Sequence, residues 1–479
     1  MPPTHRHRSA RRLLPAALAL LALGAGALVV KAERAAPSPA ALAQRSPMTP
    51  VLSARRAPAV IAAPVADNRL NAELQQLLAG SPGSACLDVA VEGRHVFAAG
   101  TADPFTPASL QKLVTGAAAV SILGPDTRLT TRVKAAAAPE GGVVLGDLYL
   151  VGGGDPLLMT EEFAAHLKHP PAERTSAAAL ADAIAATGLK EVRGRLLGDD
   201  SRYDAERYPP SWPERFATEG ESGPISALAL DRGFDQFPPT PEQRTPKEHA
   251  APDPPAHAAT VLTQLLAARG VTIAGGAGSG VAPAGAVEIA DLPSAPVQGM
   301  VAEMVRESDN LAAELLTKEV GVVTGGGGTT AAGTAAIRAE LGRLGLPVDG
   351  TAQIDGSGLS EDDRETCALV SAVLVRDGPT GPISTNLPVA GQTGTLEKRF
   401  VGSAVVGRLR AKTGTLNQVT ALAGVLPTAR GVTVTFSYVL NLAKPARVTD
   451  DDLSIQDRLV AVLDTYPAGP DLAALGPLP

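Results

Sequence analysis

Ser109 and Lys112 lie three positions apart in the stretch Ser109-Leu110-Gln111-Lys112. On a helix these two positions share a face, so the hydroxyl and the amine can meet. A serine becomes a good nucleophile when a base removes its proton, and a neutral lysine in a water-excluded site can be that base. The first turn of a helix also has free N–H groups that favour developing negative charge. The pair is compatible with acyl-serine chemistry, although chance register is the better explanation of such a pair when it stands alone.

A second polar group, Ser308-Asp309-Asn310, lies between two stretches with helical apolar spacing, 297–305 and 311–320. The Ser308 hydroxyl could relay a proton to a leaving amine, and the Asn310 amide could hold the peptide of a substrate. Taken alone, this tripeptide is more typical of an ordinary helix N-cap.

The third group is Lys412-Thr413-Gly414-Thr415, which follows the stretch 405–411. On an edge strand the lysine and the hydroxyls would point into a cleft and bind a carboxylate. Gly414 would let a substrate approach the backbone closely. An exposed strand end is the simpler explanation of this tetrapeptide by itself.

Two near-copies of these groups occur elsewhere. Ser384-Thr385-Asn386 repeats the serine and asparagine spacing inside a loop rich in proline and glycine, and Gln392-Thr393-Gly394-Thr395 repeats the third group without its lysine. We expect neither near-copy to replace the group that it resembles.

The elements that position these groups can be predicted in outline. Thr106 is a good N-cap and Pro107 a good first helical residue, so a helix is predicted to run to about Leu123 with Ser109 in its first turn. Strict alternation over 432–440, after an apolar stretch and a turn, predicts an antiparallel pair of strands. Further predictions are a hairpin around Glu92-Gly93, strand character in 143–151, helices over 256–270 and 453–463, and loop over 237–255. Helices near both sequence ends with an antiparallel sheet predict an α+β fold.

The N-terminus has the pattern of an export signal. Four arginines within residues 6–12 precede an uncharged run, 13–30, and Lys31 follows it. The run is also just long enough to span a bilayer, so residues 1–31 are predicted to be a signal peptide or a membrane anchor. The charge asymmetry leaves the rest of the chain outside the cytoplasm. Residues 32–68, rich in proline and alanine without periodicity, are predicted to be a disordered linker.

Composition excludes several classes of partner. The net charge is −7 and no basic stripe is interleaved with aromatic residues, which argues against nucleic acid. The two cysteines, Cys86 and Cys367, cannot form a disulfide framework or an all-cysteine metal site. They could form one bridge or remain two buried thiols, and thiols are the favoured interpretation. We expect no metal and no cofactor.

Together the three groups form the ordered set S-x-x-K, S-D-N, K-T-G, which is the motif set of penicillin-binding proteins and serine β-lactamases. The numbering separates Ser109 from Ser308 by 199 residues, far more than compact β-lactamases use. The chain therefore resembles class C penicillin-binding proteins, the penicillin-binding protein 4 family of D-alanyl-D-alanine carboxypeptidases. Similar segments include LYLVGGGDP at 148–156 and DGSGLS at 355–360.

The resemblance implies a fold and a set of roles. The fold would be a β-lactamase/transpeptidase-like domain, an antiparallel sheet flanked by helices, formed by 69–133 and 286–468, with a large inserted domain at 134–285. Ser109 would be the nucleophile and Lys112 its base, and Ser308 and Asn310 would complete the proton relay and hold the substrate amide. The side chains and backbone of one strand would bind the substrate carboxylate and complete the oxyanion hole: Lys412, Thr413, Gly414 and Thr415.

The activity that the resemblance implies is D-alanyl-D-alanine carboxypeptidase, acting on peptidoglycan stem peptides and acylated by β-lactams. A DD-endopeptidase would use the same acyl transfer on a longer leaving group. A β-lactamase is the nearest alternative, but no E-x-x-L-N glutamate follows Asn310 to activate water. A non-catalytic wall-binding protein is another, and the intact motif set argues against it.

Overall fold

The computed structural model describes residues 57–468, with side chains from residue 63. The predicted signal or anchor and the linker up to residue 56 lie outside the described residues. No helix within the described range is both long and apolar enough to cross a bilayer.

The first described element corrects part of the linker prediction. Helix α3 (Ala57–Ala79) covers residues 57–68, which were predicted to be disordered. Its buried side chains include Ala66, Leu70 and Leu74, spaced four residues apart, so the segment has a packed face that continues into the predicted folded part. The alanine-rich sequence favours a helix, and Pro64 inside it removes one hydrogen bond without ending it.

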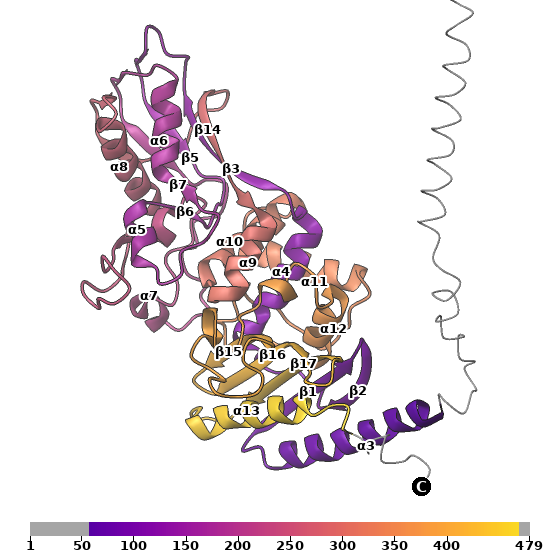
Figure 1. Cartoon of the computed structure of the whole chain (residues 1–479). Coiled ribbons are helices and arrows are strands. Elements are labelled where there is room, and N and C mark those ends of the chain that lie inside the picture. Colours follow the sequence, from indigo (N-terminus) through magenta and orange to yellow (C-terminus); the bar gives the residue numbers. More distant parts are fainter. Residues whose placement is uncertain (1–56, 469–479) are drawn as a thin grey trace, which may run out of the picture. The chain divides into compact units, whose positions relative to one another are not determined.

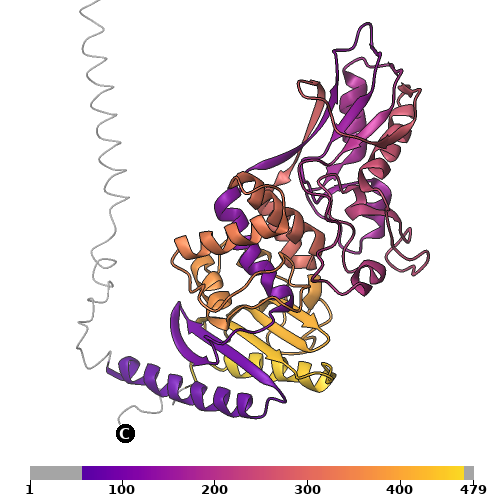
Figure 2. The same cartoon turned by 180° about the vertical axis from the view of Figure 1, so that it is seen from behind.

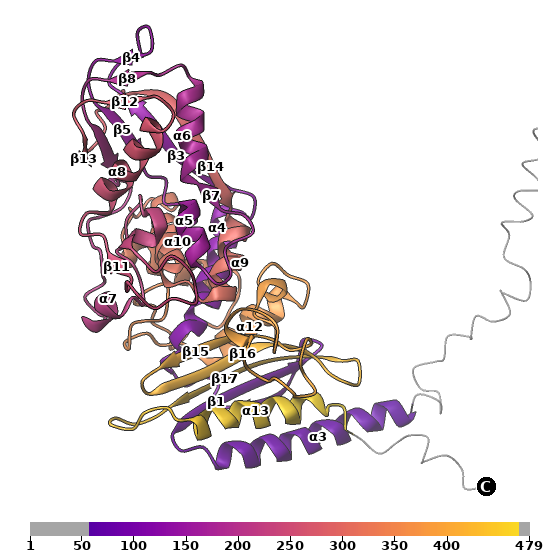
Figure 3. The ribbon, with the colours of Figure 1, turned by 60° about the vertical axis from the view of Figure 1, so that its left-hand side comes forward.

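The main sheet has five strands in the order β15-β16-β17-β1-β2, and every neighbouring pair is antiparallel. The hairpin predicted around Glu92-Gly93 and the predicted C-terminal strand pair are both present. The strand that carries the third motif, β15, lies at one edge of the sheet, as expected (Figure 3). The bounds are β1 (Ser84–Val91), β2 (Arg94–Ala99), β15 (Arg410–Leu416), β16 (Val419–Pro427) and β17 (Thr433–Asn441).

Helices cover both faces of this sheet, which confirms the α+β class. α3 and α13 (Asp450–Asp464) pack on one face, with a core that includes Phe436 and Tyr438 (Figures 1 and 2). A helical layer covers the other face, and its core includes Leu113 and Val301. This layer consists of α4 (Gln111–Leu123), α9 (Val297–Glu307), α10 (Asn310–Val323), α11 (Thr330–Arg343) and α12 (Cys367–Asp377).

The long segment between α4 and α9 forms a second sheet with its own core, in the order β13-β9-β5-β3-β14. The chain enters the insertion through β3 (Arg128–Ala135) and leaves it through β14 (Val287–Pro296), and these two strands pair in antiparallel orientation (Figure 1). Because both strands belong to the inserted sheet, we propose boundaries near 128 and 296 in place of 134 and 285. The other strands are β5 (Leu148–Val151), β9 (Leu196–Asp199) and β13 (Ala277–Ser279), and α6 (Ala177–Ala186) and α8 (Pro254–Ala267) pack on the sheet.

Short elements complete the insertion. The segment 237–255, predicted to be loop throughout, also contains β11 and the start of α8. The short strands are β4 (Val143–Val144), β6 (Leu158–Met159), β7 (Thr175–Ser176), β8 (Glu191–Val192), β10 (Phe234–Gln236), β11 (His249–Ala250) and β12 (Thr272–Ile273), and the short helices are α5 (Glu161–His166) and α7 (Arg215–Glu219).

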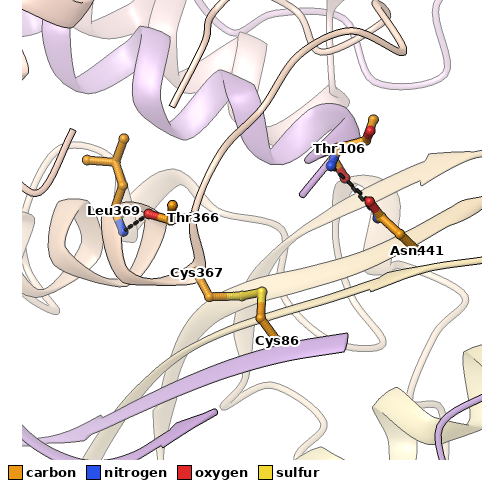
Figure 4. Close-up of a disulfide and its surroundings, with 6 residues drawn as sticks. All are labelled: Cys86, Thr106, Thr366, Cys367, Leu369 and Asn441. Carbon is orange, nitrogen blue, oxygen red and sulfur yellow. Dashed lines mark hydrogen bonds between the residues drawn. A yellow bond between two sulfur atoms is a disulfide. The ribbon is translucent and has the colours of Figure 1, made fainter. Parts of the chain in front are cut away.

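A disulfide joins Cys86 in β1 to Cys367, the first residue of α12, with 6.1 Å between their Cα atoms (Figure 4). The interpretation of two buried thiols was therefore wrong. The two cysteines are 281 positions apart in the sequence, and only the packing of α12 against the sheet brings them together.

Replacing both cysteines with alanine should lower the free energy of unfolding by about 2–5 kcal/mol, because the cross-link restricts a very long loop in the unfolded chain. Denaturant unfolding without reductant would measure the loss. Reductant should destabilise the wild-type protein similarly and leave the double variant unaffected. An unfolding midpoint of the wild type that does not respond to reductant would contradict this expectation.

Candidate active site

Ser109 lies in a single 3₁₀ turn, η1 (Ala108–Leu110), which leads directly into α4. The predicted N-cap, Thr106, does not cap this helix. Pro107 precedes the turn and no side chain caps it. Instead, the Asn441 side chain holds the Thr106 backbone: Thr106 N–H donates to Asn441 Oδ1 at 2.9 Å, and Asn441 Nδ2 donates to Thr106 O at 3.1 Å (Figure 4). The last residue of β17 therefore fixes the segment that presents the serine.

Lys112 is completely buried, and its ammonium has three acceptors. Lys112 Nζ donates to Ser109 Oγ at 3.0 Å, to Asn310 Oδ1 at 2.6 Å and to Ser357 O at 2.6 Å. Burial lowers the pKa of Lys112 to about 8, and the opposing charges of Asp355 and Glu314 limit this shift. A substantial neutral fraction near pH 8 lets this amine accept a proton from Ser109.

The second motif turns sharply between two helices. Ser308 ends α9 in the left-handed region, with φ of 62° and ψ of 36°. Asp309, and not Ser308, is the N-cap of α10, because its side chain accepts from Ala312 N–H at 2.9 Å. Capping by Asp309 leaves Ser308 and Asn310 free to face the other motifs. Asn310 Nδ2 also donates to the Glu221 carbonyl oxygen of the insertion, at 2.6 Å.

Lys412 on edge strand β15 is buried next to the second motif. Lys412 Nζ donates to Ser308 Oγ at 2.8 Å and to Thr413 O at 2.9 Å. Burial lowers the pKa of Lys412 well below its ordinary value, and the nearby charge of Lys112 acts in the same direction. The lysine thus links the second and third motifs, and a bound anion would favour its charged form.

Gly414 has a structural role in the packing of the serine turn. A Cβ at this position would lie 2.8 Å from Pro107 O and 3.2 Å from Ala108 Cβ. The serine turn therefore packs directly on β15, and a side chain at 414 would push the two apart. Thr415 follows on the same strand and pairs with Thr420 of β16.

The two near-copies differ in their relation to the site. Ser384 is buried in the turn η3 (Ser384–Asn386), and within residues 57–468 no hydrogen bond joins it to Ser109, Lys112 or Lys412. Thr395, from the other near-copy, receives a hydrogen bond from Thr413 Oγ1 at 2.9 Å. The sequence did not predict this contact, because Thr395 lacks a neighbouring lysine and lies in a different segment.

Sequence reasoning also missed the residues that position the backbone acceptor of Lys112. The loop 355–360 supplies the Ser357 carbonyl, and Asp355 fixes this loop by accepting N–H bonds from Ser357, Gly358 and Ser360 at 3.0, 2.6 and 2.7 Å. Trp212 of the insertion donates to the same carboxylate at 2.7 Å. The segment DGSGLS was noted only as a point of resemblance, and its density of small and polar residues was the available signal.

Glu314, one helical turn after Asn310, is a second missed residue. It is completely buried, and its Oε1 accepts from Gly356 N–H at 3.0 Å and Ser357 N–H at 2.8 Å. Burial raises the pKa of Glu314, and the charge of Asp355 adds to this rise. This carboxyl group fixes the backbone whose carbonyl receives a bond from Lys112.

Hydrogen bonds to Lys112 therefore connect Ser109 with Asn310. A further hydrogen bond connects Ser308 with Lys412, and the backbone of the second motif joins the two groups. The profile of the D-Ala-D-Ala carboxypeptidase 3 (S13) family matches residues 70–252 and 238–465 of the chain. The chain belongs to the S13 family.

Two curated relatives of this S13 chain are named as carboxypeptidases. A D-alanyl-D-alanine carboxypeptidase of Actinomadura sp. (strain R39) is 31% identical over 447 residues, covering 78% of this chain and 79% of the relative. Carboxypeptidase DacB of Mycolicibacterium smegmatis is 33% identical over 386 residues, covering 79% of each chain.

Solved structures confirm the fold. Penicillin-binding protein 4 of Haemophilus influenzae superposes with a TM-score of 0.68 at 20% identity, covering 82% of this chain and 99% of that protein. A second structure of the Haemophilus protein contains a bound β-lactam and superposes with a TM-score of 0.61, at 19% identity and the same coverage. The β-lactamase/transpeptidase-like fold with a large inserted domain is thus established for this S13 chain.

Space for a ligand lies beside the motif residues. A cavity of about 610 Å³ adjoins Thr415, and its lining combines residues of the main domain with Arg215 and Glu221 of the insertion. A smaller cavity of about 180 Å³ lies against Ser308 and Asn310 and is also bounded by Leu167 of the insertion. Both parts of the chain therefore shape the surroundings of the site.

Proposed function

We propose that this protein is a serine-type D-alanyl-D-alanine carboxypeptidase that trims peptidoglycan stem peptides through an acyl-serine intermediate. The observation that carries the proposal is the buried Lys112, whose Nζ lies 3.0 Å from Ser109 Oγ and 2.6 Å from Asn310 Oδ1 in a chain of the S13 family. A buried amine with a lowered pKa beside a hydroxyl is the arrangement that activates a serine nucleophile.

In the acylation step, neutral Lys112 takes the proton of the Ser109 hydroxyl while Ser109 Oγ attacks the carbonyl carbon of the penultimate D-alanine. The N–H groups of Ser109 and Thr415 stabilise the oxyanion, and one such donor is typically worth about 10²–10³ in rate. Lys412, Thr413 and Thr415 bind the carboxylate of the terminal D-alanine, and Gly414 lets the strand pack against the serine turn.

Collapse of the tetrahedral intermediate breaks the C–N bond, and the leaving amine takes a proton. Ser308 is the proposed donor: its hydroxyl, bonded to Lys412 Nζ at 2.8 Å, gives its proton to the amine and receives the proton that Lys112 took from Ser109, which returns Lys112 to its neutral form. Asn310 holds the substrate amide. Free D-alanine leaves, and water then attacks the acyl-serine with Lys112 acting as base.

The proposed partners and compartment follow from this chemistry. Peptidoglycan stem peptides are the substrates, and β-lactams acylate Ser109 because they offer the same carbonyl and carboxylate. The site of action is extracytoplasmic, with residues 1–31 as export signal or, if retained, as membrane anchor through 13–30. DD-endopeptidase activity is a second proposed function, because it differs only in the leaving group.

The lifetime of the penicillin adduct tests the proposal against a β-lactamase. Bound penicillin keeps its second ring in the site, which blocks the incoming water, whereas departure of D-alanine opens the site. Intact-protein mass spectrometry should show an adduct that persists for minutes to hours, while a D-Ala-D-Ala peptide turns over continuously. Loss of the adduct within seconds, with hydrolysed drug accumulating, would favour the β-lactamase instead.

A further inference from the structure

Seven residues form a ring at the end of the site where Lys412 and Thr413 lie, joined partly by side-chain contacts and partly by the backbone. Two hydrogen bonds form the part of this ring near β15, Lys412 Nζ to Ser308 Oγ at 2.8 Å and Thr413 Oγ1 to Thr395 Oγ1 at 2.9 Å. The main domain also contributes two carboxylates, one preceding Ser308 and one following Thr395 in the chain. In order, the ring comprises Ser308, Lys412, Thr413, Thr395, Glu397, His169 and Glu307.

The inserted domain closes this ring through the segment 166–171, here called the strap. His169 Nδ1 lies 3.3 Å from Glu307 Oε2, and His169 Nε2 lies 3.9 Å from Glu397 Oε2. Lys168 also forms an ion pair with Glu397. No sequence pattern predicted these contacts, because the partners of His169 are far away along the chain.

The two ends of the strap are held by contacts other than those of its middle residues. At its start, His166 bonds Glu248 at 3.0 Å and its ring lies 5.5 Å from that of Phe163, which is buried. At its end, Pro170 and Pro171 restrict the backbone. Between these points the Lys168 side chain is 51% exposed, and exposed ion pairs are weak. The ends of the strap are therefore fixed independently of the exposed ion pair in its middle.

The ring lies where the leaving group must lie, if the proposed function is correct. Lys412 and Thr413 would bind the carboxylate of the residue that departs. In a monomeric stem peptide that residue is D-alanine, whose side chain is a methyl group. In a cross-linked peptide the departing residue carries a whole second peptide, which must pass out of the ring.

We propose that Lys168 and His169 determine the specificity of the enzyme by closing this exit. The closed strap admits D-alanine as leaving group and excludes the second peptide of a cross-link, so carboxypeptidase activity exceeds endopeptidase activity. Opening the strap exposes the exit without altering Ser109, Lys112 or the carboxylate-binding strand.

The test compares two substrates with the variant Lys168→Ala/His169→Ala. One substrate is a monomeric peptide ending in D-Ala-D-Ala, and the other is a cross-linked dimer whose leaving residue has a free carboxylate. The ratio of dimer cleavage to monomer cleavage, each as kcat/KM, should rise by about tenfold or more, the scale at which a steric contact discriminates substrates. Both substrates place a carboxylate in the ring, so loss of the Lys168 charge should change both kcat/KM values by the same factor and leave their ratio unaffected.

Arg174→Ala is the matched control. It removes a 2.7 Å ion pair with Glu161 that lies within the insertion and outside the ring, so the ratio should stay at the wild-type value. An unchanged ratio in the strap variant would overturn the proposal, as would loss of both activities together, which would make the strap part of substrate binding. Failure of the wild-type enzyme to cleave the monomer or to bind penicillin would instead refute the proposed function.

Discussion

Ser109→Ala should abolish covalent penicillin labelling and lower cleavage of D-Ala-D-Ala peptides by about 10⁶ in kcat, the usual cost of losing a catalytic nucleophile. Ser109 Oγ is the acceptor of the Lys112 amine, and no other motif serine lies in hydrogen-bond reach of that amine among the described residues. Alanine fits the 3₁₀ turn, whose geometry is set by Asn441 and by packing on β15. The variant should therefore fold normally.

Fluorescent penicillin followed by gel electrophoresis would measure labelling, and a denaturant unfolding curve would show that the fold is kept. Ser384→Ala is the control, because it removes the hydroxyl of a buried serine, and this hydroxyl has no hydrogen-bond partner within the described range. This control should label like the wild type. Labelling of Ser109→Ala at the wild-type rate would refute the assignment of the nucleophile.

Lys112→Ala should reduce the rate of acylation by about 10²–10⁴, the range that general-base catalysis contributes. The same change removes the hydrogen bonds to Asn310 Oδ1 and to the buried Ser357 O, so both acceptors lose a partner and the effect should fall at the upper end. Lys112→Arg keeps the positive charge, but a guanidinium cannot accept a proton at these pH values, so acylation should stay slow.

The pH dependence of acylation identifies the base. Lys112 must be neutral to accept a proton, and burial lowers its pKa to about 8. The wild-type acylation rate should therefore rise with pH and reach half of its plateau near pH 8, in contrast to the free lysine value near 10.4. Measuring acylation by penicillin from pH 6 to 10 would show this rise, which the alanine variant should lack. A rate that is independent of pH in the wild type would exclude Lys112 as the base.

The sequence by itself determined the features that depend on near neighbours. Ser109 and Lys112 meet because three positions on a helix share one face, and strict alternation predicted β17 with its antiparallel partner β16. The three motifs in their order along the chain indicated acyl-serine chemistry, because the set S-x-x-K, S-D-N, K-T-G is typical of penicillin-binding proteins and serine β-lactamases. These features require no knowledge of which distant segments meet.

Only the tertiary structure decided the contacts between segments far apart in the chain. Asn441 replaced Thr106 as the residue that fixes the serine turn, and Cys86 paired with Cys367 across 281 positions. The pKa of Lys112 depends on burial beneath α10 and the loop 355–360, which local periodicity does not report. The contacts of the strap with Glu397 and Glu307 likewise form only because the insertion packs against the main domain. Sequence patterns record the face that each segment buries, whereas the partner of that face is fixed by the packing of the whole chain.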